Sequence, residues 1–364
     1  MFKQSYNIIG VMSGTSLDGV DVAHLYFKII DGKWHYEILE CETVSYSEDW
    51  LNNLKAAVTF SETKLQQLNQ DFTLLLSTVI KTFIEKYKIK NLDAVCSHGH
   101  TILHQPQNGL TLQIGNLPKI AEIIKQTVVC DFRVQDVQLG GQGAPLVPVG
   151  DKILFSEFDY CLNLGGFSNV SFEHNNTRIA FDIAPVNTVL NFYSRQLGFD
   201  YDDNGKISRS GKLDSELFKE LNALEYYKKA YPKSLGFEFV KETILPLIEK
   251  YPIATEDKMH TFTEHSAFQT SLALNYLDTS NRKILITGGG AYNNFLIERI
   301  QFYLPQLTII IPDAKTLEYK EALIFGLLGV LKLRNENNVL CSVTGAKHDH
   351  SAGIIFYPAL PAFG

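Results

Sequence analysis

The chain of 364 residues has little of what marks several common classes of protein. No apolar run reaches the ~18 residues that a membrane-spanning helix needs. The five cysteines are widely separated and include no Cys-x-x-Cys pair, which argues against a disulfide framework or a structural zinc site. The N-terminal stretch MFKQSYNIIG lacks the basic, apolar and small-residue zones of a secretion signal. We therefore expect a cytoplasmic protein with reduced cysteines and no membrane partner.

Positive charge is scarce as well. The formal net charge is −7 and the sequence pI is near 5.8, which argues against a nucleic-acid partner or an anionic lipid surface. Any anionic ligand must then be held by backbone dipoles, hydroxyl groups and single cations. In other respects the composition is that of an ordinary globular protein, with 45% hydrophobic and 20% charged residues. Such a length favours about two domains.

The order of expected elements suggests that one architectural unit occurs twice. Three strand-like runs up to residue 46 predict an antiparallel meander, and the strongest helical periodicity of the chain follows at 65–87. From residue 161 a second meander begins, followed by a second series of strands and helices. We expect an α/β protein with domains at 1–150 and 151–364, in which the extreme C-terminus returns to the first domain.

Each meander carries a turn of small residues directly after an apolar strand. The first turn, SGTSLDG at 13–19, offers N–H and hydroxyl donors for phosphate but lacks the lysine of a P-loop. Asp18 and Asp21 would repel phosphate unless a cation such as Mg²⁺ lies between. Taken alone, this segment is equally well interpreted as an Asp-Gly hairpin turn.

Three more turns of small residues make a nucleotide site the better prediction. They are LGGFSN at 164–169, FDIAPVN at 181–187 and ITGGGAYNN at 286–294, and each follows an apolar strand. A triple glycine between a strand and a helix lets the backbone approach a charged or planar ligand closely. A tight strand-to-helix turn remains the alternative interpretation of the triple glycine.

Ten ordered segments make the sequence resemble the anhydro-N-acetylmuramic acid kinase family: GVMSGTSLDGVD, SHGHTILHQP, TLQIGN, DFRVQDVQLGGQGAPLVP, LNLGGFSN, FDIAPVN, PKSLGFEF, ITGGGAYNN, KEALIFG and SVTGA. The resemblance runs from about residue 7 to residue 354. It implies two actin-like (ribonuclease H-like) domains flanking a nucleotide cleft. It also implies an enzyme of peptidoglycan recycling that opens 1,6-anhydro-N-acetylmuramic acid with water and phosphorylates O6, using ATP and Mg²⁺. Its partners would be this small sugar and ATP, and a homodimer is left open.

The resemblance also implies which residues act. Asp182 would be the catalytic base that deprotonates the attacking water. As an alternative, Asp182 caps the helix that starts near Pro185. Metal binding, through Mg²⁺, would fall to Asp18 and Asp21. The residues implied for nucleotide binding are Gly14, Thr15, Ser16, Leu17, Asp18, Gly19, Val20, Asp21, Gly165, Gly166, Asn187, Gly288, Gly289 and Gly290.

Three residues are expected to bind the sugar. Arg133 presents a planar fork that suits the lactyl carboxylate of muramic acid, although a surface ion pair with Asp131 or Asp136 would explain it nearly as well. Glu321 begins a strongly apolar helix, where a first-turn glutamate is usually favoured by the helix dipole alone. The resemblance makes Glu321 a ligand of a sugar hydroxyl and His98 a substrate contact.

The histidines of SHGHTILH suggest a competing interpretation. His98, His100 and His104 have a spacing that could supply zinc ligands, but no matching set of further ligands is evident. A metal-dependent hydrolase is therefore the weakest alternative. The family usually has glutamine at the position of His100.

The sequence also departs from the family's usual pattern. Ile183, Ala184 and Val186 replace a hydroxyl residue and two glycines, and their side chains could crowd a bound nucleotide. Leu235 and Phe237 stand where threonine and arginine are common. These departures leave two alternatives open: a kinase for another anhydro or amino sugar, and a non-catalytic ATP- or sugar-binding sensor of the same fold.

Overall fold

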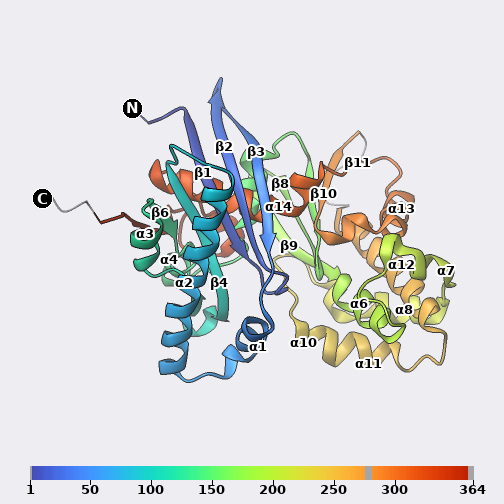
Figure 1. The fold of residues 1–364 in the computed structure, drawn as a ribbon. Coiled ribbons are helices and arrows are strands. Elements are labelled where there is room, and N and C mark those ends of the chain that lie inside the picture. Colours follow the sequence, from blue (N-terminus) through green and yellow to red (C-terminus); the bar gives the residue numbers. More distant parts are fainter. Residues whose placement is uncertain (1, 275–280, 360–364) are drawn as a thin grey trace, which may run out of the picture. The chain divides into compact units, whose positions relative to one another are not determined.

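The computed structural model describes residues 2–274 and 281–359 (Figure 1). The chain divides into two compact units, one formed by Met1–Leu154 with Tyr319–Gly364 and the other by Phe155–Glu318. The return to the first unit therefore begins at Tyr319, earlier than the extreme C-terminus that the sequence suggested.

The first unit contains a seven-stranded sheet with the order β12-β6-β4-β1-β2-β3, and β5 pairs with β4. The three N-terminal strands form the expected antiparallel meander, whereas β4 runs parallel to β1 and β6 parallel to β4. The strands are β1 (Ser5–Ser13), β2 (Val20–Ile30), β3 (Lys33–Val44), β4 (Ala94–Gln105), β5 (Leu110–Ile114), β6 (Val128–Cys130) and β12 (Ile354–Phe356).

The second unit contains a five-stranded sheet with the order β11-β10-β7-β8-β9. It again has an antiparallel meander, β7-β8-β9, followed by two strands that run parallel to β7. The strands are β7 (Tyr160–Leu164), β8 (Phe167–His174), β9 (Thr177–Pro185), β10 (Lys283–Thr287) and β11 (Thr308–Ile310).

Both sheets thus share one strand order. When β5 and β12 are left out, the first sheet has the order β3-β2-β1-β4-β6 and the second β9-β8-β7-β10-β11, so both have the order 3-2-1-4-5. In each, the first three strands are antiparallel and the last two run parallel to the first. This is the topology of the ribonuclease H-like units of actin-like proteins. The expected α/β class and the duplication of one actin-like unit are confirmed.

Helices complete both units. In α2, Ser61 accepts a hydrogen bond from the amide of Lys64, so the helix begins before the predicted residue 65. The helices of the first unit are α1 (Glu48–Ala56), α2 (Glu62–Lys86), α3 (Lys119–Ile124), α4 (Val134–Gln138), α5 (Val147–Leu154) and α15 (Cys341–Thr344). Those of the second are α6 (Asn187–Gln196), α7 (Lys206–Ser210), α8 (Ser215–Ala223), α9 (Glu225–Lys228), α10 (Phe237–Phe239), α11 (Leu245–Ile248), α12 (Thr255–Leu274) and α13 (Asn294–Tyr303). None of the helices in the described ranges is long and apolar enough to cross a membrane.

The helix α14 (Ala314–Leu333) begins in the second unit and continues into the first. A side chain at Gly10 in β1 would approach the backbone oxygen of Ala322 to 2.1 Å, and one at Gly329 would approach Cys96 Sγ to the same distance. Glycine at these positions lets α14 lie close against the first sheet. This packing explains why the C-terminal part of the chain belongs to the first unit.

Candidate functional site

Two glycine-containing turns of the second unit meet at the carboxyl ends of β7 and β10. These strands are parallel neighbours, with Asn163 in register with Thr287. A side chain at Gly288 would approach Oδ1 of Asn163 to 2.6 Å, and one at Gly290 would approach Cβ of Leu164 to 2.7 Å. Gly288 also has a φ of +83°, a conformation that other residues rarely adopt. Close approach of the two turns therefore requires these glycines.

The N-terminus of α6 joins the same cluster. The amide of Asn187 donates to the oxygen of Gly165 at 3.3 Å, and the hydroxyl of Thr188 donates to the oxygen of Gly166 at 2.9 Å. Gly166 and Gly289 are exposed, so their backbone is open to a ligand. The structure thus brings together all six nucleotide-binding residues expected in the second unit. Exposed glycine turns beside a helix N-terminus suit phosphate.

Asp182 lies on β9 of the same unit and is half-buried. The amide of Leu235 donates to its Oδ2 at 2.9 Å, and the hydroxyl of Tyr226 donates to its backbone oxygen at 2.6 Å. Burial raises the pKa of Asp182, and the hydrogen bond from Leu235 opposes that rise. The alternative interpretation as a helix cap is wrong, because α6 begins at Asn187 with Val186 as its N-cap residue. Asp182 is therefore a positioned carboxylate with a raised proton affinity.

The three departures from the family pattern do not crowd this site. Ile183, Ala184 and Val186 are no more than 2% exposed and belong to the apolar core of the second unit. The crowding suggested by the sequence is wrong, because these side chains pack inward rather than toward a ligand. A motif in one-letter code does not reveal which face of the backbone each side chain takes.

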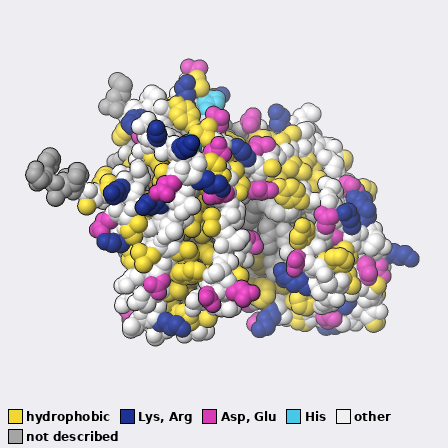
Figure 2. All heavy atoms as spheres, in the orientation of Figure 1, with side chains coloured by type: hydrophobic (Ala, Val, Ile, Leu, Met, Phe, Trp, Pro, Cys, Tyr) yellow, Lys and Arg dark blue, Asp and Glu magenta, His cyan; other side chains and the backbone are white. Residues whose placement is uncertain are grey.

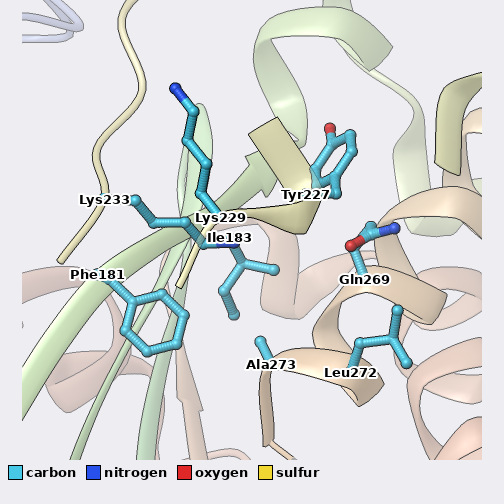
Figure 3. A pocket seen from close by; sticks show the side chains of 8 residues that line it. All are labelled: Phe181, Ile183, Tyr227, Lys229, Lys233, Gln269, Leu272 and Ala273. Carbon is cyan, nitrogen blue, oxygen red and sulfur yellow. The ribbon is translucent and has the colours of Figure 1, made fainter. Parts of the chain in front are cut away.

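A small pocket of about 60 Å³ is lined by side chains of β9 and α12 (Figure 3). Phe181 and Ile183 of β9 line it together with Gln269, Leu272 and Ala273 of α12, and with Tyr227, Lys229 and Lys233. In Figure 3 the amino group of Lys229 points away from the pocket. Successive side chains of a strand point to opposite faces, so Asp182 faces away from the pocket. The pocket is separate from the candidate catalytic carboxylate.

The turn between β1 and β2 holds the nucleotide-binding residues expected in the first unit. The amide of Leu17 donates to the oxygen of Gly14 at 3.2 Å, and Thr15, Ser16 and Asp18 are exposed. A side chain at Gly19 would approach the oxygen of Val44 to 2.6 Å. The hydroxyls and amides of this turn are therefore accessible to phosphate. Val20 is only 1% exposed, so its side chain belongs to the core and only its backbone could contact a ligand.

The two aspartates expected to act through Mg²⁺ differ in their surroundings. Asp18 is exposed, whereas Asp21 is half-buried and accepts a hydrogen bond from the hydroxyl of Thr43 at 2.6 Å. No group of three or more metal-ligating side chains occurs among the described residues. Two carboxylates fit Mg²⁺, which commonly takes one or two protein ligands and completes its shell with phosphate and water.

The residues expected to bind the sugar lie together in the first unit. Nε of Arg133 donates to Nε2 of His98 at 2.8 Å, and Nη1 donates to the oxygen of Gly143 at 2.6 Å. Burial lowers the pKa of Arg133 to about 10, which leaves the guanidinium charged at neutral pH. Burial and the nearby guanidinium hold the pKa of His98 well below its usual range. His98 is therefore neutral, and Arg133 has a fixed orientation.

An ion pair does not explain Arg133. Within the described part of the chain it forms no ion pair with Asp131 or Asp136. The fully buried carboxylate of Asp136 instead accepts hydrogen bonds from the amide of Gly143 at 2.6 Å and the hydroxyl of Thr344 at 2.7 Å. Asp136 thus fixes the loop that accepts the Arg133 hydrogen bond. Sequence reasoning missed this role, because Thr344 is distant in the chain.

Glu321 lies within α14, not in its first turn as the sequence suggested, because the helix begins at Ala314. Glu321 is exposed, yet partial desolvation by the surrounding protein raises its pKa. The positive charge of Arg133 opposes this rise, and the negative charge of Asp21 adds to it. The neighbouring Lys320 forms a buried ion pair with Asp151 at 2.8 Å. Glu321 is therefore an accessible carboxylate on a firmly anchored turn of helix, electrostatically linked to Arg133.

The three histidines do not form a metal site. The Nδ1 atom of His100 lies 2.7 Å from the hydroxyl of Ser13, and that of His104 lies 3.1 Å from the hydroxyl of Thr111. With His98 bound to Arg133, each histidine has its own partner. Ser13 also contacts the hydroxyl of Tyr46 at 2.5 Å, so a hydrogen-bonded network anchors the start of the turn at 13–19. Sequence reasoning missed this network.

The sequence comparisons with known proteins agree with one another. Residues 6–358 match the family model described as anhydro-N-acetylmuramic acid kinase. A protein of that name from Mannheimia succiniciproducens is 33% identical over 98% of this chain and all of its own length. One from Bacillus cereus is 34% identical over 97% of this chain and all of its own length. A ROK hexokinase structure from Thermus thermophilus aligns with 90% of this chain and 99% of its own at a TM-score of 0.38 and 10% identity.

Proposed function

The chain belongs to the anhydro-N-acetylmuramic acid kinase family, and we propose that it opens 1,6-anhydro-N-acetylmuramic acid with water and phosphorylates O6 at the expense of ATP. The product would be N-acetylmuramic acid 6-phosphate. The structural observation that supports this most directly is Asp182, a positioned carboxylate of raised pKa in the unit that also holds the glycine turns. We place this reaction in the cytoplasm, where ATP is supplied.

Asp182 is the general base in the proposed mechanism. Its Oδ2 is held by the amide of Leu235, and the other oxygen takes a proton from the attacking water. The hydroxide oxygen bonds to C1 as the bond from C1 to O6 breaks. The released O6 then takes the γ-phosphoryl group of ATP, and ADP leaves. Because phosphoryl transfer captures the developing charge on O6, no protein acid is needed there.

The turns of both units would hold the nucleotide. In the second unit, the segments at 165–166 and 288–290 and the N-terminus of α6 present backbone groups to phosphate. In the first unit, the turn at 14–19 adds exposed hydroxyl and amide donors. Mg²⁺ would be held by Asp18 or Asp21 and would neutralise phosphate charge.

Arg133, His98 and Glu321 would bind the sugar. The guanidinium of Arg133 suits the lactyl carboxylate, because a planar fork matches a carboxylate in geometry and charge. Glu321 is accessible and can accept hydrogen bonds from sugar hydroxyls. The interpretation as a non-catalytic sensor drew on the altered FDIAPVN segment. The burial of Ile183, Ala184 and Val186 removes crowding as a reason for it.

The test is a direct assay of the pure protein. Incubation with Mg²⁺, ATP and 1,6-anhydro-N-acetylmuramic acid should yield ADP and a sugar heavier by one water and one phosphoryl group. EDTA should abolish both products and Mg²⁺ should restore them. An anhydro sugar without the lactyl group is the matched comparison, because its preferred use would indicate a kinase for another sugar. ADP without sugar product, or no ADP, would contradict the proposal.

A further inference from the structure

Four polar residues form a row across the second sheet. Thr287 of β10 is in register with Asn163 of β7, Asn163 with Asn169 of β8, and Asn169 with Asp182 of β9. Directly opposite residues in paired strands project to the same face of a sheet. The row therefore runs from the end of β10, where the triple glycine begins, to the candidate catalytic base.

The neighbouring row is entirely apolar. Leu162, Val170 and Phe181 pair across the same strands, are no more than 5% exposed, and belong to the core. By contrast, Asn163 and Asn169 are half-buried, as is Asp182. Polar side chains within a sheet cost stability unless their hydrogen bonds are satisfied. The polar row thus needs a reason beyond the packing of the sheet.

The side-chain amides of Asn163 and Asn169 lack hydrogen-bond partners in the described ranges 2–274 and 281–359. Nδ2 of Asn163 lies 3.3 Å from where a side chain at Gly165 would begin, and Oδ1 lies 2.6 Å from the same point at Gly288. The amide of Asn163 therefore lies between the two glycine turns. Neither it nor the amide of Asn169 is hydrogen-bonded to a described residue. Both retain their donors and acceptors for a ligand.

A β-bulge aligns the other end of the row. The register of β8 and β9 shifts between Ser168, which pairs with Ala184, and Asn169, which pairs with Asp182. Ile183 is the extra residue, and its side chain is buried in the core. Bulges near active sites re-aim side chains and locally change the pairing. This bulge places Asn169 directly opposite Asp182.

We propose that Asn163 and Asn169 are two further residues of the active site, an inference that rests on the proposed function. Asn163 donates from Nδ2 to a phosphate oxygen of ATP. Oδ1 of Asn169 accepts a hydrogen bond from one O–H of the attacking water, and Asp182 removes the proton of the other O–H. Together they point a lone pair of the water at C1. Neighbouring strands lie ~4.8 Å apart, so the row spans ~10 Å from Asn163 to Asp182. That span accommodates one sugar ring with phosphate on one side and water on the other.

Substituting the two asparagines should cause different defects, one in kcat and one in nucleotide affinity. A merely structural role would not separate these two effects. Asn169→Ala should lower kcat about 10²-fold and leave the affinities for sugar and for a non-hydrolysable ATP analogue within about two-fold. Asn163→Ala should weaken binding of the analogue by about 10-fold, as expected for loss of a hydrogen bond to a charged group. Calorimetric titration measures both affinities. Asn52→Ala, which removes an exposed amide on α1, is the control and should change neither quantity.

A second variant addresses the contact with Asp182. Asn169→Asp places a like charge opposite the base, so the pKa of Asp182 should rise and the acid limb of kcat/KM should move to higher pH. An unmoved limb, or an Asn169→Ala variant with wild-type kcat, would overturn the inference. If the wild-type protein has no turnover with the sugar, the proposed function fails by itself. The affinity of Asn163→Ala for the ATP analogue still tests the role of Asn163 in that case. An affinity equal to that of the wild type would contradict the role of the polar row.

Discussion

Nε of Arg133 donates to Nε2 of His98 at 2.8 Å, and this contact fixes both side chains. An acceptor at Nε2 places the imidazole proton on Nδ1, which lies 3.0 Å from the backbone oxygen of Gly99. A second guanidinium nitrogen, Nη1, is engaged by Gly143. Both N–H groups of Nη2 and the second N–H group of Nη1 make no hydrogen bond to the described residues, so these two nitrogens can contact a carboxylate ligand.

The first prediction concerns this guanidinium. Arg133→Lys keeps the charge but loses the planar fork, so the KM for 1,6-anhydro-N-acetylmuramic acid should rise about 10-fold or more, with a smaller change in kcat. For an anhydro sugar without the lactyl group the same variant should change KM little. Steady-state kinetics with both sugars provide the comparison. Equal losses for both would assign Arg133 to structure or to phosphate.

The second prediction concerns acid stability. His100 is 3% exposed, and burial lowers its pKa to about 4 from an ordinary value of 6.5. Between these values the unfolded chain binds more protons than the folded chain, so the free energy of unfolding falls as pH decreases from 6.5 to about 4. One such histidine contributes a slope of up to about 1.4 kcal/mol per pH unit.

His100→Gln removes this titrating group. The free energy of unfolding should therefore fall less steeply between pH 6.5 and about 4, by up to the slope that corresponds to one proton. Glutamine also retains a group that can hydrogen-bond Ser13, the partner of His100 at 2.7 Å. Urea unfolding at a series of pH values measures the slope, and His348→Gln, which changes an exposed histidine, is the control. A slope identical to that of the wild type would mean that His100 titrates alike in the folded and unfolded states.

Much of the fold could be predicted from local patterns. Alternating apolar residues marked both meanders, and the apolar spacing of α2 marked a long helix. The course of α14 could not be predicted, because its place depends on contacts such as Gly10 with Ala322, which are distant in sequence. Strand β12 was missed for the same reason, since it has three residues and pairs with β6.

In the candidate site, too, local patterns could be predicted from the sequence and contacts between distant residues could not. The glycine turns were evident because glycine has a distinct conformational role, and the structure brings the second-unit turns together. Asp136 and the polar row at Asn163 and Asn169 were missed, because strand register and long-range hydrogen bonds decide their partners. Val186 was misjudged because a motif does not state which way a side chain points.

The third prediction follows from that burial. Val186 is fully buried in the core of the second unit, so Val186→Gly should leave a cavity and reduce the free energy of unfolding by about 2–4 kcal/mol. Affinity for ATP should not improve, because the side chain faces away from a ligand. Thermal unfolding and calorimetric titration measure the two effects. Tighter ATP binding in this variant would show that Val186 does crowd the nucleotide.

The fourth prediction concerns the base itself. Asp182→Asn keeps the size of the side chain and an oxygen that can accept the hydrogen bond from Leu235, but it cannot take a proton from water. We expect kcat to fall about 10²- to 10⁴-fold while the affinities for sugar and nucleotide change little. In the wild-type protein, burial raises the pKa of Asp182 above 3.8, so the acid limb of kcat/KM should lie above that of an ordinary aspartate.

The two chemical steps should fail together in this variant, because O6 becomes a nucleophile only as the anhydro bond opens. In water enriched with oxygen-18, the wild-type product should carry the label at the anomeric carbon. The label must be measured promptly, before exchange of the open-chain form with the enriched water introduces it without the enzyme. Neither labelled sugar nor ADP above background should appear with Asp182→Asn. Phosphorylated sugar formed at a near wild-type rate would remove Asp182 from the mechanism. ADP formed without labelled sugar would mean that phosphoryl transfer to water proceeds without the base, so that Asp182 serves ring opening alone.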